Sequence, residues 1–199
     1  MDTSVPYERK RMEHLGTVRL ETDRLILRRF AVEDAAVMYR NWANDPEVTK
    51  FLTWQPHANV DETIRILTDW AGHYEEKDWY LWAIVRKENG DEPVGSISIV
   101  QKDDHIAMVQ FGYCIGQKWW HQGIMSEALA AMMRFFFEEV GVNRIEAHHD
   151  PENPNSGKVM MKCGMRREGL RRAASWNNQG ICDSAIYGIL AEDYAAMNG

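Results

Sequence analysis

The sequence predicts one α+β domain. Its 199 residues are the length of a single ordinary domain, and 45% of them are hydrophobic, which provides a core. Segments with helical spacing alternate with strand-like segments in the order β-α-α-βββ-α-β-α-ββ, and no internal repeat or low-complexity tract divides them. We therefore expect a sheet of about six to seven strands flanked by about four helices.

The first elements follow a mixed-charge stretch. Residues 1–18 lack a steady period and are interpreted as an N-terminal extension, flexible or loosely docked, which leaves residues 19–199 for the domain. Residues 24–30 have the apolar density of a strand, and residues 32–44 continue as a helix. Asn59 and Glu62 are then spaced as a capping box, and apolar residues at 3-4-3 spacing extend this second helix to about Lys77.

The middle of the chain changes to strand periodicity. Residues 80–87, 94–100 and 106–116 read as three successive strands separated by polar turns. Asn89 and Gly90 form a hairpin signal because both residue types tolerate positive φ. The three strands are therefore expected to be antiparallel.

The C-terminal part returns to helix and strand in alternation. Two apolar rows at four-residue spacing predict a helix over residues 124–140, and Gly141 is a natural stop. Residues 143–149 read as a strand, and residues 156–163 as a short helix before Gly164. Residues 169–176 and 181–190 then form two strands around the turn 177–180.

Composition excludes several classes of protein. The formal net charge of -7 argues against a nucleic-acid groove as the main function. The three cysteines form no CxxC pair, so they are expected to be reduced and to bind no metal. No apolar run approaches the roughly 18 residues of a membrane span, and the N-terminus lacks the apolar core of a signal peptide. A cytoplasmic protein without membrane contact is the expectation.

The stretch QKWWHQGIMSEAL, Gln117 to Leu129, places a glycine turn directly before a helix. The free N–H groups of a helix N-terminus can bind phosphate without lysine, and Gly123 would allow close approach of a ligand. Ordinary helix initiation with Ser126 as the cap explains the same pattern. Asn153 and Ser156, three residues apart at the next helix start, leave a similar choice between capping and ligand binding.

Four segments in this order resemble the GNAT superfamily of N-acetyltransferases, and most closely its branch of ribosomal-protein N-terminal alanine and serine acetyltransferases. The segments are ETDRLILRRFAVEDA, NDPEVTKFLTW, WWHQGIMSEAL and DPENPNSGKVMMKCGMRREG, and the resemblance extends from about Leu20 to Tyr194. It implies a mixed, mostly antiparallel sheet with a V-shaped splay. It also implies acetyl-CoA as co-substrate.

The resemblance assigns the coenzyme-A pyrophosphate to the loop around Gly123. The family pattern Gln/Arg-x-x-Gly-x-Gly/Ala falls on Trp120 to Met125, where only Gly123 matches strictly, and His121 stands where glycine is common. Asn153 would hydrogen-bond the pantetheine arm, and Ser156 would lie beside the sulfur. The implied coenzyme contacts are Phe111, Tyr113, Cys114, Ile115, His121, Gln122, Gly123, Ile124, Met125, Ser126, Asn153, Ser156 and Lys162.

Acetyl transfer also needs an acid for the leaving thiolate and a base for the amine. Ser156 is the expected acid. Many relatives carry a glutamate where this chain has Gln110, which cannot accept a proton, so Glu146, Asp150 and Asp183 remain candidate bases. Trp54 is expected to line an acceptor pocket beside Gln110. His148 and His149, as strand neighbours, point to opposite faces and cannot share a metal ion.

The expected activity is direct transfer of an acetyl group from acetyl-CoA to a primary amine, either a peptide N-terminus or a small amine. The alternative is a coenzyme-A-binding sensor or scaffold without catalysis, which the substitution at Gln110 keeps open. A nucleotide phosphotransferase is disfavoured because no Gly-rich GK[ST] loop is present. Both a monomer and a homodimer are compatible with the sequence.

Overall fold

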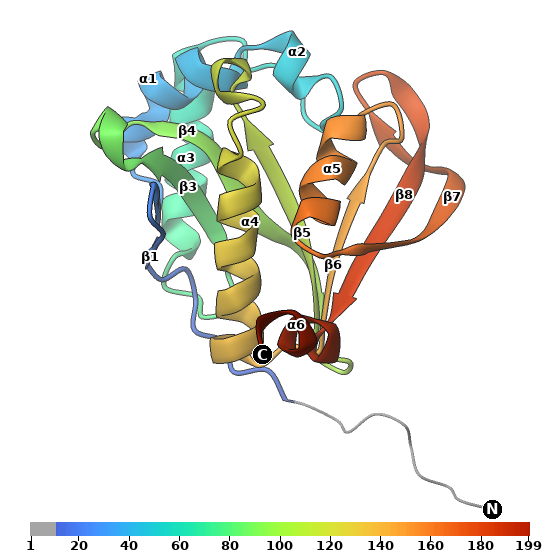
Figure 1. Cartoon of the computed structure of the whole chain (residues 1–199). Coiled ribbons are helices and arrows are strands. Elements are labelled where there is room, and N and C mark those ends of the chain that lie inside the picture. Colours follow the sequence, from blue (N-terminus) through green and yellow to red (C-terminus); the bar gives the residue numbers. More distant parts are fainter. Residues whose placement is uncertain (1–10) are drawn as a thin grey trace, which may run out of the picture.

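The computed structural model describes residues 11–199 and contains one mixed sheet. Its eight strands lie in the order β1-β2-β3-β4-β5-β6-β8-β7 (Figure 1). Pairing is antiparallel except between β5 and β6. The strands are β1 (Leu20–Glu21), β2 (Leu25–Arg28), β3 (Leu81–Arg86), β4 (Pro93–Asp103), β5 (Met108–Ile115), β6 (Arg144–His149), β7 (Arg166–Asn177) and β8 (Gly180–Leu190).

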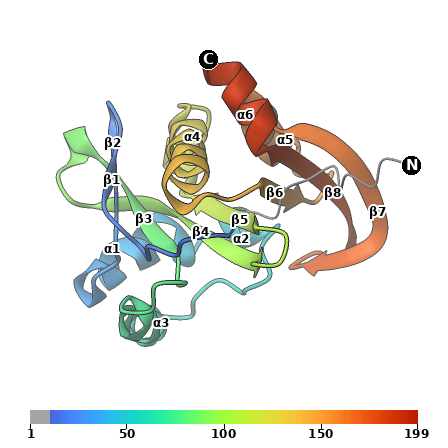
Figure 2. The same ribbon diagram turned by 90° about the horizontal axis from the view of Figure 1, so that it is seen from below.

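Helices cover both faces of this sheet. Figure 2 shows α4 on one face, and α1 and α3 on the other. The helices are α1 (Ala35–Met38), α2 (Pro46–Thr49), α3 (Val60–His73), α4 (Ile124–Phe135), α5 (Pro154–Lys162) and α6 (Ala191–Asn198). A 3-10 turn at Val32–Asp34 and a π-helical turn at Tyr39–Ala43 flank α1, and a second π-helical turn, Phe136–Val140, extends α4 to Gly141.

The α+β class and the mixed sheet are confirmed, but the expected numbers of elements were too low. The sheet has eight strands rather than six to seven, and the described residues contain six α-helices rather than four. The additional strand β1 is two residues long and α2 is four, which is too short to show a period. The third missed element, α6, buries no residue, so its sequence carries no apolar stripe.

Local sequence signals predicted some ends of helices and strands correctly and others incorrectly. The Asn59 side chain accepts a hydrogen bond from the Glu62 N–H, which is one half of the predicted capping box. The other half is absent, because the Glu62 carboxylate accepts from the Ala58 N–H rather than from that of Asn59. Gly141 ends the α4 region in a left-handed conformation. The β3–β4 connection is longer than a two-residue turn, with a 3-10 turn over residues 87–89 before Gly90 at φ 71°. Strand β4 continues to Asp103, through part of the predicted polar turn.

Two hydrophobic cores lie on opposite faces of the sheet. The larger one packs α4 and its π-helical extension against the sheet, where Phe136 makes edge-on contacts with Tyr80, Trp82 and Phe111. The smaller one buries Trp42 and its neighbours beneath α3. Both faces of the central strands are therefore apolar, and β3 is buried over nearly its whole length.

Strands β5 and β6 separate part-way along their length. Their parallel pairing runs from Met108 with Arg144 to Phe111 with Ala147 and stops there. Strand β5 stays paired with β4 as far as Ile115, while β6 stays paired with β8 as far as His149. The sheet therefore opens into a V between residues 112–115 and residues 148–149, as the resemblance implied.

Residues 11–18 pack against the domain. Met12 and Thr17 are buried, and the Thr17 hydroxyl donates to the Trp79 carbonyl and accepts from the Leu81 N–H, both at 3.0 Å. This part of the predicted extension is therefore docked on β3. The remainder of the extension, residues 1–10, lies outside the described residues.

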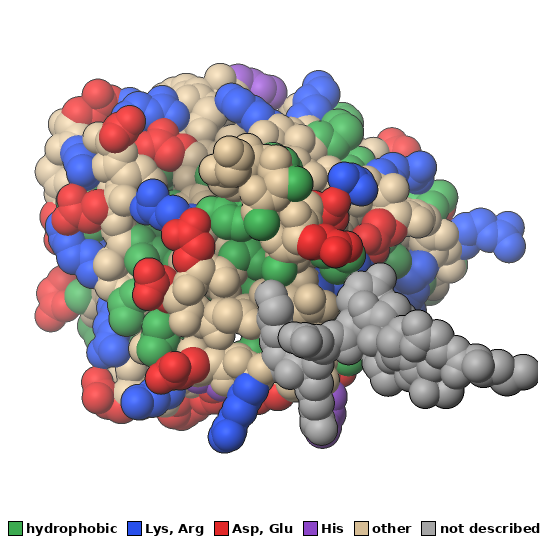
Figure 3. Space-filling model, turned by 60° about the horizontal axis from the view of Figure 1, so that its bottom comes forward, with side chains coloured by type: hydrophobic (Ala, Val, Ile, Leu, Met, Phe, Trp, Pro, Cys, Tyr) green, Lys and Arg blue, Asp and Glu red, His purple; other side chains and the backbone are tan. Residues whose placement is uncertain are grey.

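Charged side chains are mixed over the surface. Acidic and basic groups are interspersed among hydrophobic ones on the face shown in Figure 3. None of the helices within residues 11–199 combines the length and the apolarity that crossing a membrane requires.

The Thr17 hydroxyl provides a test of the docked segment. Replacing Thr17 with Val leaves a buried carbonyl and a buried N–H unpaired, so we expect the free energy of unfolding to fall by about 1–3 kcal/mol. Thr17→Ser keeps the hydroxyl and is expected to lose less. Denaturant unfolding of both variants measures the difference, and equal stabilities would show that the two hydrogen bonds contribute nothing.

Candidate functional site

The N-terminus of α4 presents a set of free backbone donors. Gly123 precedes the helix with φ 73°, and the first hydrogen bond of the helix runs from the Glu127 N–H to the Gly123 carbonyl at 3.1 Å. The N–H groups of Ile124, Met125 and Ser126 precede that ladder and have no partner within the helix. No side chain caps α4, so capping by Ser126 is wrong. The helix dipole adds partial positive charge at this point.

The two departures from the pyrophosphate pattern have simple explanations. His121 adopts φ 60°, a left-handed conformation that favours glycine, which explains why glycine is common at its position. The Met125 side chain is buried in the main core rather than crowding the loop. A ligand at the start of α4 would therefore contact mainly the backbone of Met125 and little of the Met125 side chain.

Two cations flank the Gly123 turn. A Cβ atom at Gly123 would lie 3.6 Å from an Arg24 guanidinium nitrogen and 3.8 Å from the Lys162 ammonium. Arg24 is held by the Gln122 carbonyl at 3.2 Å and by the Glu127 carboxylate at 2.6 Å. Burial opposes ionisation of Glu127, but hydrogen bonds from Thr22 and Arg24 outweigh it and lower the pKa of the carboxyl. An anion at Gly123 would thus meet backbone donors and two positive charges.

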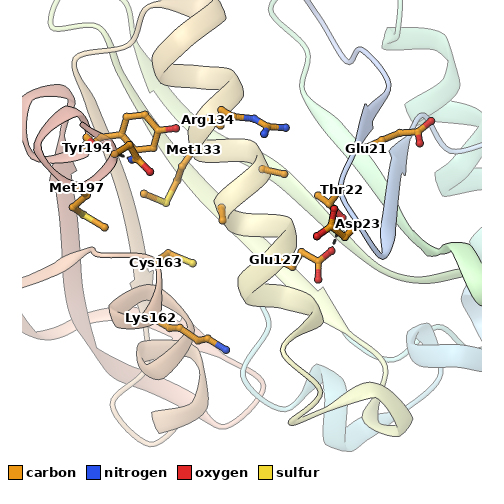
Figure 4. A pocket seen from close by; sticks show the side chains of 13 residues that line it. Glu21, Thr22, Asp23, Glu127, Met133, Arg134, Lys162, Cys163, Tyr194 and Met197 are labelled. Carbon is orange, nitrogen blue, oxygen red and sulfur yellow. Dashed lines mark hydrogen bonds between the residues drawn. The ribbon is translucent and has the colours of Figure 1, made fainter.

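Arg24 is the residue that sequence reasoning missed at this turn. It lies 98 positions before Gln122 in the sequence, and no local spacing connects the two. Lys162, which the resemblance did indicate, extends from α5 toward the first turn of α4 (Figure 4).

A cleft of about 430 Å³ runs from this turn through the open part of the sheet. It is bounded by the end of β5, the start of α4, the start of α5 and the segment around α2. Of the predicted site residues, the cleft brings together Tyr113, Cys114, Ile115, His121, Gly123, Ile124, Met125, Ser126, Asn153, Ser156 and Lys162.

Four other predicted residues do not line the cleft. Phe111 is buried in the core, and the Gln122 side chain turns back to the Lys118 carbonyl. Gln110 lies beside Glu146 in the paired part of β5 and β6. Trp54 packs against His57, with ring centroids 5.3 Å apart, while its neighbour Phe51 does line the cleft.

The candidate carboxylate bases are engaged elsewhere. Asp183 accepts from the Ala173 N–H at 2.9 Å, where Ala173 stands at φ 47° in a bulge of β7. Asp150 accepts from Asn177 at 2.7 Å and from the Glu152 N–H at 2.9 Å. Neither Asp150 nor Asp183 lines the cleft, although Glu152 does, and a catalytic role for either carboxylate stays a prediction.

Glu146 also lies outside the cleft lining. It accepts from the Arg144 guanidinium at 2.7 Å and contacts the His148 ring at 3.2 Å. Within residues 11–199, no group of three histidine, cysteine or acidic side chains could hold a metal ion.

The start of α5 brings two hydroxyl groups together inside the cleft. The Tyr113 hydroxyl donates to the Ser156 carbonyl at 3.1 Å and lies 3.4 Å from the Ser156 hydroxyl. Burial raises the pKa of Tyr113 well above its ordinary value, so the phenol keeps its proton. Asn153 lines the cleft and occupies the N-cap position of α5 without a side-chain capping bond. Capping therefore does not explain Asn153.

Cys114 is the cysteine that lies in the cleft. Burial raises the pKa of its thiol, and the Ser96 hydroxyl lies 3.3 Å from its sulfur. A protonated thiol is a poor nucleophile. All three cysteines of the chain are free.

The far wall of the cleft is held by the β7–β8 turn. The Asn178 amide donates to the carbonyls of Thr49 and Trp54 at 2.9 and 2.8 Å, and its backbone N–H donates to the Leu52 carbonyl at 3.2 Å. Gln55 completes the contact by donating to the Asn178 side-chain oxygen at 2.6 Å. The hydrogen bonds of Asn178 therefore fix the loop that carries Phe51 and Leu52, although the two segments lie more than a hundred residues apart in the sequence.

A second groove, of about 700 Å³, lies beside the cleft (Figure 4). It runs along the side of α4 between the β1–β2 turn and α6, and it shares Lys162 with the cleft. The Thr22 hydroxyl bonds to Glu127 at its edge. Because this groove lacks the free N–H groups of a helix N-terminus, the cleft is the better anion site.

Comparison with known proteins agrees with this geometry. The domain family described as "Acetyltransferase (GNAT) domain" matches residues 24–166. The chain belongs to the GNAT acetyltransferase family. Members of this family bind acetyl-CoA as co-substrate together with an amine acceptor.

Individual relatives cover most of the chain. The uncharacterized N-acetyltransferase p20 of Bacillus licheniformis is 31% identical over 88% of this chain and 98% of its own length. The ribosomal protein uS5-alanine N-acetyltransferase of Escherichia coli is 30% identical over 78% of this chain and 81% of its own. The structure of the microcin C7 self-immunity acetyltransferase MccE, with acetyl-CoA and AMP, has a TM-score of 0.75 at 19% identity, covering 85% and 93% of the two chains. That last likeness shows the fold alone.

The residues of this GNAT acetyltransferase fit a pyrophosphate at Gly123. A side chain at that position would occupy the space between Arg24, Lys162 and the free N–H groups of α4, and glycine leaves that space open. The unpaired edge of β5 and the uncapped Asn153 amide suit the amide groups of a pantetheine arm.

The left-handed backbone of His121 can be tested without reference to activity. His121→Gly and His121→Ala both remove the imidazole, but only glycine relieves the strained φ of 60°. We expect the glycine variant to be more stable than the alanine variant by about 1 kcal/mol. Thermal melting measures this as a difference of about 2–4 °C. Equal melting temperatures would mean that the loop carries no strain.

Proposed function

We propose that this protein transfers an acetyl group from acetyl-CoA directly to a primary amine. The observation that carries the proposal is the continuity of the cleft: it joins the free N–H groups of α4, the unpaired edge of β5 and the loop around Phe51. A coenzyme bound with its pyrophosphate at Gly123 would direct its thioester toward the point where β5 and β6 separate. The amine would then approach from the side of the Phe51 loop.

The cleft supports a reaction without a covalent enzyme intermediate. The amine nitrogen attacks the thioester carbonyl carbon, the C–S bond breaks, and the sulfur leaves as a thiolate that takes up a proton. Backbone N–H groups on the open edge of β5 stabilise the developing oxyanion. Ser156, whose hydroxyl lies beside the Tyr113 phenol, supplies a proton to the sulfur. Cys114, with its raised pKa, is unsuited to carry the acetyl group.

The acceptor is a peptide N-terminus or a small amine. Similarity to the uS5-alanine acetyltransferase of Escherichia coli supports the peptide N-terminus. The part of the cleft beside Phe51 and Leu52 would also accept a small amine. Both kinds of acceptor therefore belong in the assay.

The test is release of free thiol from acetyl-CoA with a panel of amines and of peptides that begin with alanine or serine. Intact-protein mass after incubation with acetyl-CoA alone should show no added acetyl group. Tight acetyl-CoA binding without thiol release for any acceptor would instead support a coenzyme sensor. No binding at all would contradict both functions.

Ser156 should act on the chemical step and not on coenzyme affinity. We expect Ser156→Ala to lower kcat about a hundredfold because the thiolate loses its proton donor. The acetyl-CoA dissociation constant, measured by calorimetry, should change less than about twofold because one neutral hydroxyl contact contributes little to the affinity of a large ligand. Ser175→Ala, an exposed change on β7, is the control. Unchanged turnover in Ser156→Ala would remove this residue from the mechanism.

Arg24 should act on coenzyme affinity. Arg24→Gln removes one of the two cations beside Gly123, so we expect acetyl-CoA to bind about tenfold more weakly and with less dependence on salt. Arg40→Gln, which removes another exposed arginine that pairs with Glu92, is the matched control. Titration at low and high salt measures both effects. An affinity equal to that of the control would place the pyrophosphate away from Arg24.

A further inference from the structure

The proposed transfer lacks a base among the residues that sequence reasoning selected. Gln110 cannot accept a proton, and the carboxylates of Asp150 and Asp183 already accept hydrogen bonds from Asn177, the Glu152 N–H and the Ala173 N–H. Glu146 is paired with Arg144. An acceptor amine is mostly protonated at neutral pH, so some group must take up a proton before or during attack.

His148 stands at the point where the two strands part. The last residue of β6 that pairs with β5 is Ala147, so His148 follows directly at the start of the opening. Ile145 and Ala147 are buried on the α4 face, which places Glu146 and His148 on the opposite face. Cys114, which lines the cleft, lies on this same face of the sheet, and the amine would approach from this face. The His148 side chain is 21% exposed and is not among the residues that line the cleft, so it would act from beside the cleft.

Glu146 holds the His148 ring in one orientation. The ring nitrogen Nε2 lies 3.2 Å from a Glu146 carboxylate oxygen, while the other oxygen accepts from Arg144 at 2.7 Å. A carboxylate accepts only, so Nε2 carries the hydrogen and Nδ1 carries the lone pair. Within residues 11–199, Nδ1 has no hydrogen-bond partner. A base oriented by a carboxylate that is itself anchored is the arrangement that activates amines and hydroxyls in many enzymes.

The anchor of Glu146 extends to a third strand. Arg144 also bonds to Glu168 on β7 at 3.0 Å, and the two side chains lie directly over Gly188, where a Cβ would come within 2.5 Å of the Glu168 carboxylate. The absence of a side chain at Gly188 is therefore what lets Arg144 reach both carboxylates. From β4 to β8, the strand register places these titratable or charged groups on this face: Asp103, Cys114, Arg144, Glu146, Glu168, Arg171 and Cys182. Arg166, opposite Gly188, pairs with Asp193.

We infer that His148 is the general base of the transfer, with Glu146 as its positioning residue. The inference rests on the proposed function. Nδ1 of His148 takes one proton from the protonated amine, and the neutral nitrogen then bonds to the thioester carbonyl carbon. The C–S electron pair goes to the sulfur, which takes the Ser156 hydroxyl proton. The second proton lost by the nitrogen replaces that of Ser156 through solvent, and the imidazolium returns its own proton to solvent. The products are the amide and the free thiol, with no change of oxidation state.

The test combines a pH profile with chemical rescue. We expect His148→Gln to lower kcat at pH 7 by about 10²–10⁴-fold with unchanged acetyl-CoA binding. The deficit should shrink above about pH 8, where a peptide α-amino group is already neutral and needs no base. His148→Ala should regain turnover when imidazole is added, which a purely structural role would not allow. His105→Gln, an exposed histidine in the β4–β5 turn, is the matched control.

The outcomes separate this inference from the proposed function. If the unaltered protein releases thiol with some acceptor but His148→Gln keeps its rate and pH profile, the base assignment is overturned and the acetyltransferase function stands. If the unaltered protein releases no thiol with any acceptor, the proposed function is overturned and the assignment with it. Melting curves identify a variant that is merely unfolded, and imidazole rescue of His148→Ala then decides the matter.

Discussion

The partial separation of β5 from β6 is the constraint on which the rest of the site depends. A buried backbone group without a hydrogen bond costs about 1–3 kcal/mol, so neighbouring strands inside a sheet rarely separate without a compensating contact. Here β5 keeps its pairing with β4 to Ile115 but loses β6 after Phe111. The unpaired edge is stabilised at both sides: Tyr113 reaches under α5 to the Ser156 carbonyl, and Trp120 donates to the Ile115 carbonyl at 2.9 Å.

Three distant contacts turn this opening into a site. Arg24 and Thr22 connect the β1–β2 turn to Glu127, which fixes the first turn of α4 and places a cation beside Gly123. Asn178 connects the β7–β8 turn to the loop that carries Phe51. The contacts of Arg24 and Thr22 start near one edge of the sheet and those of Asn178 at the other, so both edges help to position the walls of the cleft.

The sequence predicted the fold and the proposed coenzyme-binding residues more accurately than it predicted the residues of the proposed acceptor pocket. Gly123 at positive φ, a free helix start and an uncapped Asn153 all agree with local patterns and with the family resemblance. Trp54 was selected for the acceptor pocket because aromatic density is visible in a sequence, but it packs on His57 while Phe51 lines the cleft. Which of two neighbouring aromatic residues faces a cleft depends on the loop conformation, which Asn178 determines.

The sequence by itself determined the elements whose signals are local. Helix α4, the stop at Gly141 and the Asn59 cap of α3 follow from spacing and backbone preference within a few residues. Only the tertiary structure decided which charged groups are free to act. Asp150, Asp183 and Glu146 look alike in the sequence, and each is engaged by neighbours that the folded chain supplies. Hydrogen bonds that join residues far apart in the chain leave no local pattern, because they depend on how strands pair and where the pairing stops.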